Sequence, residues 1–408
     1  MPTANENERI IPRPQYLQRL TEFQDRNIIK VVTGIRRSGK STLLNIFINR
    51  LRSQGVRDEQ IIYMNFESYE FKKMRDPDSL YAYVKERLCK NGRTYVFLDE
   101  IQAVTGFEEA VNGFMVDFDV DIYLTGSNAH MLSSDLATLL SGRYVEIMIY
   151  PLSFQEYMSA QDPGRSAEDC FYDYMKYGGF PFIARERNET AIDSYLGNIY
   201  DTVFLEDVIK RNEIRDSALM EKLLNFAFSS MGSLVSPSSI AKTFRNSGRN
   251  VSHETIDGYL EMLCKAYFLF KAVRYDIKGK EYLKTQNKYY VADLGLRNQV
   301  LGYRQMEPTH ALENIVYFEL LKRGYTVDLG KVGSYEVDFV ARDKNRIRYY
   351  QIAWTINTPK SREREYRPFD AIPDHYEKIL ITMDRDPVSS INGVRKIYAP
   401  DFLLNEDL

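Results

Sequence analysis

The chain has 408 residues and a formal net charge of −3, and 44% of its residues are hydrophobic. This length exceeds what one ordinary core organises and predicts two to three domains. The nearly balanced charge argues against a protein that simply coats a polyanion. The 3 cysteines, Cys89, Cys170 and Cys264, are too scattered to predict a disulfide framework or a zinc site. A polar start and the lack of a long apolar run predict no membrane contact and a cytoplasmic location.

Strand-like and helix-like segments alternate over residues 1–151, after a helical lead-in at 10–27. The expected strands lie at 27–34, 61–68, 93–102, 120–128 and 143–152, and the expected helices at 41–55, 79–90, 107–118 and 130–140. The first of these strands is a β-branched run that ends in glycine, the pattern of a buried strand. The alternation therefore predicts an α/β fold with a parallel sheet and helices on both faces.

The first expected strand leads directly into a glycine-rich loop. Residues 34–41 read GIRRSGKS and match the phosphate-binding pattern G-x-x-x-x-G-K-[ST]. Glycines let backbone amides wrap closely around phosphates, and the N-terminus of the next helix stabilises their negative charge. We expect Lys40 to contact the β- and γ-phosphates of ATP and Ser41 to ligate Mg²⁺. The other expected nucleotide contacts are Gly34, Arg36, Arg37, Ser38, Gly39 and Thr42.

Two carboxylates follow the third expected strand. The segment YVFLDE at 95–100 places Asp99 and Glu100 at the strand's end, where a parallel sheet also presents the glycine-rich loop. We expect Asp99 to hold the Mg²⁺ ion through water. We expect Glu100 to polarise the water that attacks the γ-phosphate.

Two weaker candidates come later in the same part of the chain. The segment TGSN at 125–128 ends the fourth expected strand, so Asn128 or Ser127 is a candidate for sensing the γ-phosphate or orienting water. A helix cap or a turn explains these residues equally well. Arg143 is a candidate for the arginine that stabilises the transition state, in its own chain or in a neighbouring subunit. A surface arginine has the same sequence signature, and the oligomeric state stays open.

The composition changes after Pro151. Residues 152–215 are expected to form a helical lid. Residues 216–304 have three helices followed by two strand-like runs, with the lysine-rich stretch 277–286 between the runs. This is the order of a winged helix. Residues 217–300 hold 12 Lys and Arg but 7 Asp and Glu, a net of +5 that leaves −8 elsewhere. This basic character is compatible with a DNA partner.

The expected recognition helix of the winged helix spans residues 252–265. The side chains expected to meet phosphates are Arg245, Arg249, Lys278, Lys280 and Lys284. His253, Glu254 and Asp257, at the start of the helix, do not resemble a base-reading face. A winged helix that serves only protein packing therefore stays open.

Several motifs resemble a known family. The segments GIRRSGKS, VFLDEIQ, LTGSNA and SGR…PLSFQEY resemble the prokaryotic AAA-type ATPases described as predicted AAA+ superfamily ATPases. The segments YGGFPF, KYYVADLGL, ALENIVYFEL and EVDFV resemble the C-terminal domain of unknown function that is attached to them. The resemblance runs from about Ile10 to Asp384 and implies Mg²⁺-dependent ATP hydrolysis with Lys40, Ser41 and the two carboxylates in the roles given above. Many members carry threonine where this chain has Ser41.

Residues 305–408 also resemble the PD-(D/E)XK nuclease fold, in which acids hold Mg²⁺ and a lysine assists the attacking water. Glu313 and Asp338 are the candidate acids, and Gln351-Ile352-Ala353 occupies the D/E-x-K position. Ala353 cannot replace the lysine. We therefore expect a binding or structural domain rather than a working nuclease.

The sequence as a whole predicts an ATPase whose nucleotide state repositions a C-terminal half that binds DNA or an unknown protein. Two alternatives remain at this point. One is a switch that binds ATP without hydrolysing it, and the other is a DNA nuclease controlled by ATP.

Overall fold

The computed structural model describes residues 10–127, 140, 142–302, 307–385, 390–405 and 408. Asn128 and nearly all of the helix expected at 130–140 lie outside the described residues. The chain divides into an N-terminal unit, residues 10–150 with 265–267, and a C-terminal unit, residues 151–264 and 268–408. No helix of the described residues is long and apolar enough to cross a membrane.

The N-terminal unit contains a five-stranded sheet with the order β2-β3-β4-β1-β5, and every pair of neighbouring strands is parallel. Its elements are α1 (Pro14–Glu22), β1 (Ile29–Thr33), α2 (Lys40–Ser53), β2 (Ile61–Asn65), α3 (Pro77–Glu86), β3 (Thr94–Asp99), α4 (Phe107–Asp117), β4 (Val120–Gly126) and β5 (Tyr144–Met148). Short 3₁₀ turns lie at η1 (Asp58–Gln60), η2 (Tyr69–Met74) and η3 (Ile101–Ala103). The predicted α/β fold with a parallel sheet is confirmed.

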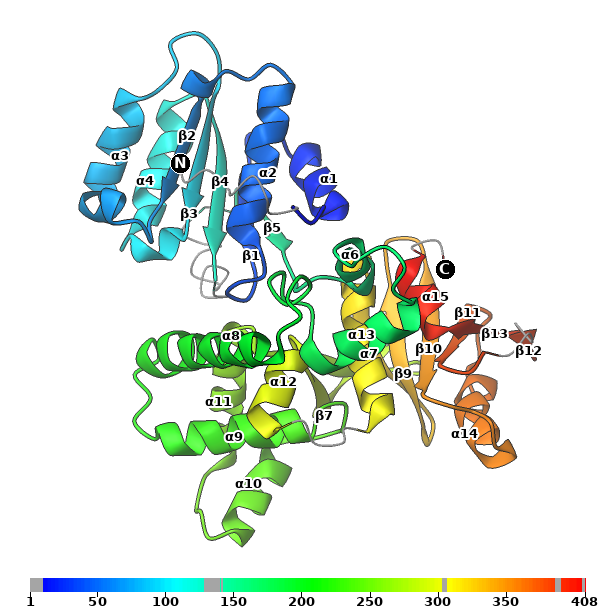
Figure 1. Ribbon diagram of the computed structural model, residues 1–408. Helices are drawn as coiled ribbons and strands as arrows, with labels where there is room; N and C mark the ends of the chain where they lie inside the picture. The colour runs from blue at the N-terminus through cyan, green and yellow to red at the C-terminus, as the bar shows by residue number, and fades with distance from the viewer. Residues whose placement is uncertain (1–9, 128–139, 141, 303–306, 386–389, 406–407) are drawn as a thin grey trace. The chain divides into compact units, whose positions relative to one another are not determined.

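Both faces of this sheet are covered by helices, α1 and α2 on one side and α3 and α4 on the other (Figure 1). Successive side chains of a strand point to opposite faces, so Val31 packs with residues of α3 and α4 while Val32 packs with residues of α1 and α2. Full burial of a side chain of this size contributes about 1.5–3 kcal/mol. The apolar side chains of the strands therefore contribute to two hydrophobic cores, one on each face of the sheet.

The parallel register brings three strand ends to one edge of the sheet. Val32 lies opposite Thr125, and Leu98 lies opposite Leu124, so β1, β3 and β4 finish side by side. The segments that follow these ends are the glycine-rich loop, the two carboxylates and Ser127. One edge of the sheet thus holds the predicted nucleotide site.

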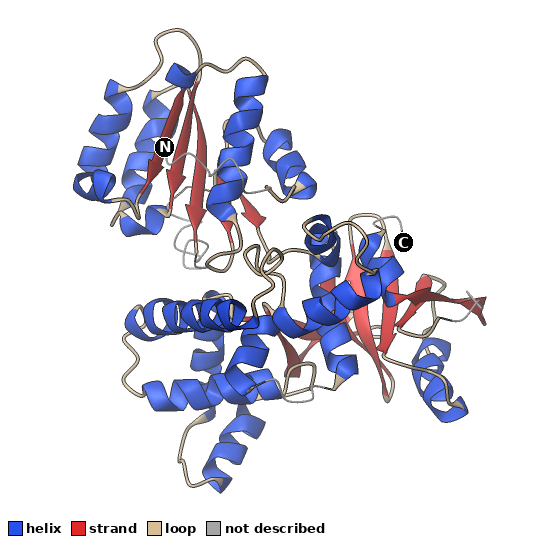
Figure 2. Cartoon of the chain, in the orientation of Figure 1, coloured by secondary structure: helices blue, strands red, loops and turns tan. Residues whose placement is uncertain are grey.

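The C-terminal unit has a mixed eight-stranded sheet with the order β12-β13-β11-β10-β9-β8-β6-β7, flanked by helices (Figure 2). Its first helices are α6 (Phe154–Ser159), α7 (Ala167–Tyr177), α8 (Glu189–Thr202), which continues as a π-helical stretch (Val203–Lys210), α9 (Ser217–Ser229), α10 (Pro237–Asn246) and α11 (His253–Lys265). The remaining elements are β6 (Leu269–Asp276), β7 (Glu281–Val291), α12 (Leu294–Leu301), α13 (Pro308–Lys322), β8 (Thr326–Val332), β9 (Tyr335–Arg342), β10 (Ile347–Ala353), α14 (Pro359–Asp370), β11 (Glu377–Thr382), β12 (Ser390–Ile391), β13 (Val394–Tyr398) and α15 (Ala399–Leu404).

The hairpin β6–β7 differs from the expectation in two respects. The lysine-rich stretch expected between the two strands is mostly strand, because the turn is confined to Ile277–Lys280 and β7 begins at Glu281. In addition, β6 pairs with β8, so the hairpin extends the sheet of the C-terminal residues. The order α9–α10–α11–β6–β7 is the one expected, but its assignment as a winged helix stays a prediction. So does the division at 215 and 304.

Asp293 joins two of the motifs that carry the family resemblance. Its carboxylate accepts hydrogen bonds from the backbone N–H of Gly179 at 2.7 Å and of Leu296 at 3.2 Å. A Cβ added to Gly178 would lie 2.0 Å from an Asp293 oxygen, so only glycine fits there. Burial raises the pKa of Asp293 to about 6. The YGG segment (177–179) and the ADLG segment (292–295) are therefore held together through the Asp293 side chain.

Candidate functional site

The loop between β1 and α2 has the backbone of a phosphate-binding loop. Gly34 and Gly39 have φ angles of 140° and 100°, and Arg37 is also left-handed at 65°. A Cβ on Gly34 would lie 2.1 Å from the carbonyl oxygen of Ile149, so glycine is required. The hydroxyl of Ser38 is buried and has no hydrogen-bond partner among the described residues. A buried donor of this kind fits the oxygen of a phosphate group.

Lys40 is the first residue of α2, and its side chain is buried in the loop. Its Nζ donates to the carbonyl oxygens of Gly34 at 3.1 Å and Ile35 at 3.3 Å. It also lies 3.7 Å from Oε1 of Glu100. The loop carbonyls are weak partners for an ammonium group, and the oxygens of a bound phosphate can replace them.

Asp99, the last residue of β3, is fully buried and held by two hydroxyls. The Tyr63 hydroxyl donates to Oδ2 at 2.8 Å, and the Thr125 hydroxyl donates to Oδ1 at 2.5 Å. Burial and the neighbouring Asp99 carboxylate raise the pKa of Tyr63, so the phenol remains a donor. These two bonds fix the orientation of a carboxylate with the chemistry of a Mg²⁺ ligand.

Glu100 follows at once in a left-handed conformation with φ of 53°. Its backbone N–H donates to the Thr125 hydroxyl at 2.9 Å, and the Ser127 hydroxyl lies 2.7 Å from both carboxylate oxygens. The amide of Gln102 donates to Oε2 as well. Burial alone would raise the pKa of Glu100, but Lys40 and these hydrogen bonds hold it below its ordinary value. Glu100 is thus an ionised carboxylate at neutral pH.

Arg13 is a residue of this site that the sequence analysis missed. Its guanidinium donates to the carbonyl oxygens of Ser38 at 3.1 Å and Tyr150 at 2.9 Å, and it lies 4.6 Å from the centre of the Tyr16 ring. Arg13 is buried, at 5% exposure. The lead-in segment therefore supports the phosphate-binding loop, a role that its polar composition did not reveal.

The remaining predicted loop residues surround this cluster. Ser41 is half-buried and Thr42 is exposed in the first turn of α2. Arg36 lies 3.4 Å from the exposed Glu67, and Arg37 is exposed. Their predicted contacts with nucleotide stay predictions.

Arg143 is not brought to this edge of the sheet. It directly precedes β5, and its carbonyl oxygen accepts a hydrogen bond from the N–H of Ile29, the first residue of β1. The loop follows the other end of β1, about 13 Å away at the rise of a strand. Arg143 therefore does not belong to the site of its own chain, because it stands at the beginning of a strand and not at its end. A role toward a neighbouring subunit stays a prediction.

The residues of the expected nuclease-like centre lie on α13, β9 and β10. The N–H of Ile352 donates to Oδ2 of Asp338 at 2.8 Å, and Oε1 of Gln351 accepts from the N–H of Asp338 at 3.4 Å. Ala353 is buried among apolar side chains. Within the described residues, no three histidines, cysteines or acids are placed to hold a metal ion.

This centre also contains a lysine that its local sequence did not indicate. Nζ of Lys288, on β7, lies 2.6 Å from Oε1 of Glu313 and 3.7 Å from Oδ1 of Asp338. The hydroxyl of Tyr290 donates to the same Glu313 oxygen at 2.6 Å. Burial alone would lower the pKa of Lys288, but the two carboxylates raise it. Burial and Glu313 raise the pKa of Asp338 to about 7.

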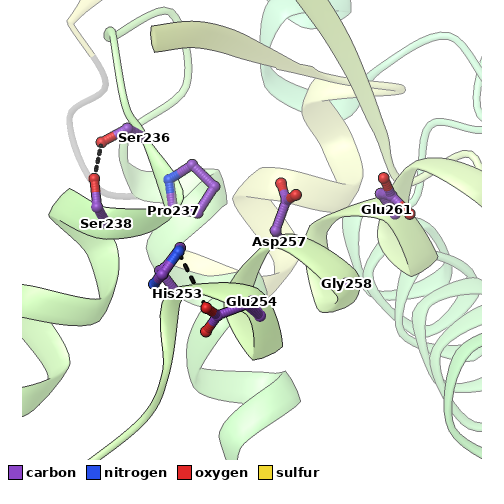
Figure 3. A pocket seen from close by; sticks show the side chains of 8 residues that line it. All are labelled: Ser236, Pro237, Ser238, His253, Glu254, Asp257, Gly258 and Glu261. Carbon is purple, nitrogen blue, oxygen red and sulfur yellow. Dashed lines mark hydrogen bonds and ion pairs between the residues drawn. The ribbon is translucent and has the colours of Figure 1, made fainter. Parts of the chain in front are cut away.

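A cavity of about 540 Å³ lies between the start of α10 and one face of α11, the helix expected to read DNA (Figure 3). Three acids of α11, Glu254, Asp257 and Glu261, line it. Their spacing of three and four residues places them on one face of the helix. This face is unfavourable for a DNA phosphate.

The basic side chains expected to meet phosphates lie in three places. Arg245 is exposed at the end of α10, and Lys278 and Lys280 are exposed in the β6–β7 turn. Arg249 lies 3.6 Å from Asp216. The side chain of Lys284 lies outside the described residues.

Two protein-family models match the chain. An AAA domain matches residues 26–158, and a domain of unknown function (DUF8612) matches residues 168–307. The first match contains the glycine-rich loop and both carboxylates. The second match contains Asp293 and its partner Gly179, but it contains neither Glu313 nor Asp338.

Relatives of nearly the same extent occur in bacteria and archaea. An uncharacterized protein of Haemophilus influenzae is 41% identical over 401 residues, which cover 97% of this chain and 99% of that protein. An uncharacterized protein of Methanocaldococcus jannaschii is 30% identical over 363 residues, which cover 85% and 79% of the two chains. Among solved structures, a Walker-type ATPase of Pyrococcus abyssi has a TM-score of 0.51 at 17% identity, covering 71% of this chain and 96% of that one. The likeness to this structure concerns the fold alone. The chain therefore belongs to the prokaryotic AAA-type ATPase family in which the AAA domain is followed by a domain of unknown function.

Proposed function

We propose that the chain binds ATP together with Mg²⁺ at the loop of residues 34–41 and hydrolyses the bond to the γ-phosphate. The proposal rests on one observation above all. Lys40, Asp99 and Glu100, which come from two different strand ends, meet at one edge of the parallel sheet. The buried Ser38 hydroxyl provides a further donor for a phosphate oxygen.

Binding of the triphosphate follows from the loop. The N-terminus of α2 and the amides of the loop favour negative charge. Lys40 exchanges the carbonyl oxygens of Gly34 and Ile35 for oxygens of the β- and γ-phosphates, which are stronger partners because they are charged. Arg13 keeps the loop in shape through the Ser38 carbonyl.

Two residues would hold the metal ion. Ser41 offers a hydroxyl and Asp99 a carboxylate, and both are oxygen donors of the kind Mg²⁺ prefers. When bound, Mg²⁺ neutralises charge that develops on the phosphate oxygens. Tyr63 and Thr125 keep the Asp99 carboxylate oriented for this task.

Glu100 acts as the base for the attacking water. Its carboxylate accepts a proton while the water oxygen bonds to the γ-phosphorus and the bond to the β-phosphate oxygen breaks, which gives ADP and phosphate. The low pKa of Glu100 ensures that the group is ionised. Ser127 and Gln102 orient it.

The contribution of Ser127 can be tested by pH dependence. Because its hydroxyl favours the ionised form of Glu100, Ser127→Ala is expected to raise the Glu100 pKa. A base with a lowered pKa is active above that pKa, so the acidic limb of the phosphate-release profile moves to higher pH. Ser127→Thr retains the hydroxyl and is expected to keep the wild-type profile. An identical acidic limb in Ser127→Ala would show that Ser127 does not act on Glu100.

We further propose that the nucleotide state repositions the C-terminal unit and so changes its affinity for DNA or a protein. The exposed cations Arg245, Lys278 and Lys280 favour a nucleic acid, whereas the acids that line the α11 cavity favour a protein partner. A nuclease controlled by ATP is the weaker alternative, because Ala353 stands at the sequence position where that chemistry needs a lysine, and Lys288, the lysine present in this centre, is paired with Glu313.

Metal removal separates hydrolysis from simple binding. With saturating ATP and Mg²⁺, we expect steady release of inorganic phosphate, and excess EDTA is expected to abolish it, because Mg²⁺ neutralises the phosphate charge. A coupled phosphate assay measures the rate. Saturable ATP binding without phosphate release under both conditions would favour the switch that binds ATP without hydrolysing it.

A further inference from the structure

The C-terminal unit contains a buried cluster of charges that the ATP site does not use. We call Glu313, Asp338, Lys288 and Tyr290 the carboxylate centre. Its carboxylates come from α13 and β9, and its lysine and tyrosine come from β7. The side chains of Lys288, Glu313 and Asp338 are 9%, 4% and 14% exposed.

Two carboxylates placed together away from water need a cation. An unpaired buried charge is strongly unfavourable, and two like charges from different elements also repel each other. Both a divalent metal ion and an ammonium group carry positive charge that can offset the two negative charges. Here Nζ of Lys288 lies 2.6 Å from Glu313 and 3.7 Å from Asp338.

The lysine and a metal ion compete for the same space. A Mg²⁺ or Mn²⁺ ion bridging these carboxylates needs their oxygens at about 2.0–2.2 Å, with further oxygen ligands around it. The ammonium group of Lys288 already lies against both carboxylates. Gln351 has a side-chain carbonyl next to Asp338. Its Oε1 accepts a hydrogen bond from the Asp338 backbone N–H at 3.4 Å, and its amide donates to Glu365 at 2.9 Å. A second lone pair of Oε1 is available to a metal ion.

We propose that Lys288 is a built-in cation that occupies the metal position of the carboxylate centre, and that removing its charge opens a divalent-cation site formed by Glu313, Asp338 and Gln351. In the wild-type chain the carboxylate centre is then a buried network of ion pairs that connects β7 with α13 and β9. The proposal does not depend on ATP hydrolysis. The rival idea is a metal-dependent nuclease centre in which Lys288 assists the attacking water, and this idea requires metal binding while the lysine is present.

The test counts bound Mn²⁺ by electron paramagnetic resonance on the full chain without nucleotide. Lys288→Met is expected to bind one Mn²⁺ more than wild type, and the double variant Lys288→Met with Glu313→Gln is expected to lose it. Wild type and Glu313→Gln are expected to bind equal amounts of Mn²⁺. Mn²⁺ bound at other sites contributes equally to every variant and does not affect the difference between them. Lys360→Met, at an exposed position in the first turn of α14, serves as the matched control and is expected to behave as wild type.

Stability gives a second readout, because Lys288→Met leaves two buried carboxylates without their cation. Its melting temperature is expected to fall and to recover with Mn²⁺, and if it folds poorly, Mn²⁺ present during refolding is expected to restore it. The double variant is expected to gain nothing from Mn²⁺. Either of two results overturns the proposal: wild-type Mn²⁺ binding that Glu313→Gln removes, or a Lys288→Met chain that shows neither additional Mn²⁺ nor a gain in stability or refolding from it.

Discussion

Replacing Glu100 by glutamine is expected to slow ATP hydrolysis about 100- to 10,000-fold, the usual contribution of a positioned acid or base. Glutamine has nearly the same size and can still bond to Ser127, but it cannot accept the proton of the attacking water. ATP binding is expected to survive, because the loop, Lys40 and Asp99 are unchanged. Phosphate release at saturating Mg²⁺-ATP gives the rate, and titration with labelled ATP gives the affinity.

The control for this variant is Glu109→Gln, which makes the same chemical change at an exposed position of α4. It is expected to leave both rate and affinity at wild-type values. If Glu100→Gln hydrolyses ATP as fast as this control, Glu100 is not the base. The role of the neighbouring Asp99 as a Mg²⁺ ligand would then have to be reconsidered as well.

Replacing Lys40 by alanine is expected to weaken ATP binding about 100- to 10,000-fold. Two charge-assisted hydrogen bonds to phosphate are lost, each worth about 1.5–3 kcal/mol, and every 1.4 kcal/mol is a factor of ten in affinity. Hydrolysis is lost along with binding. Equilibrium titration with labelled ATP and Mg²⁺ measures the change.

The variant Lys40→Ala also removes the ion pair with Glu100, so its folding is checked by thermal melting. Lys73→Ala, at an exposed position in the same unit, is the matched control and is expected to bind ATP like wild type. An unchanged ATP affinity in a folded Lys40→Ala chain would mean that nucleotide binds somewhere other than the loop of residues 34–41.

The juxtaposition of the candidate nucleotide-site residues was predictable because the signals for it are local. Lys40, Asp99 and Glu100 each lie within a few residues of a strand end, and the parallel arrangement of the strands then determines that these ends meet. The same reasoning places Arg143 at the opposite edge, since it precedes a strand. Its selection as a candidate relied on its residue type and not on its position relative to β5.

Contacts between distant segments could not be predicted in this way. Arg13 reaches the loop across 25 residues and Lys288 reaches Glu313 across the same separation, and nothing in either local sequence indicates the partner. The pairing of β6 with β8 is equally remote from the hairpin pattern. It places β7, which carries Lys288, in the same sheet as β9, which carries Asp338.

The most direct test of the central claim is a single-turnover experiment with the wild-type chain in excess over γ-labelled ATP. After addition of Mg²⁺, the reaction is quenched with acid at intervals, so that phosphate still bound to the protein is counted together with released phosphate. We expect the bound ATP to be converted to ADP and phosphate in the wild-type chain and to remain intact in Glu100→Gln over the same interval. Recovery of unchanged ATP from the wild-type chain, under conditions where binding is complete, would contradict this expectation.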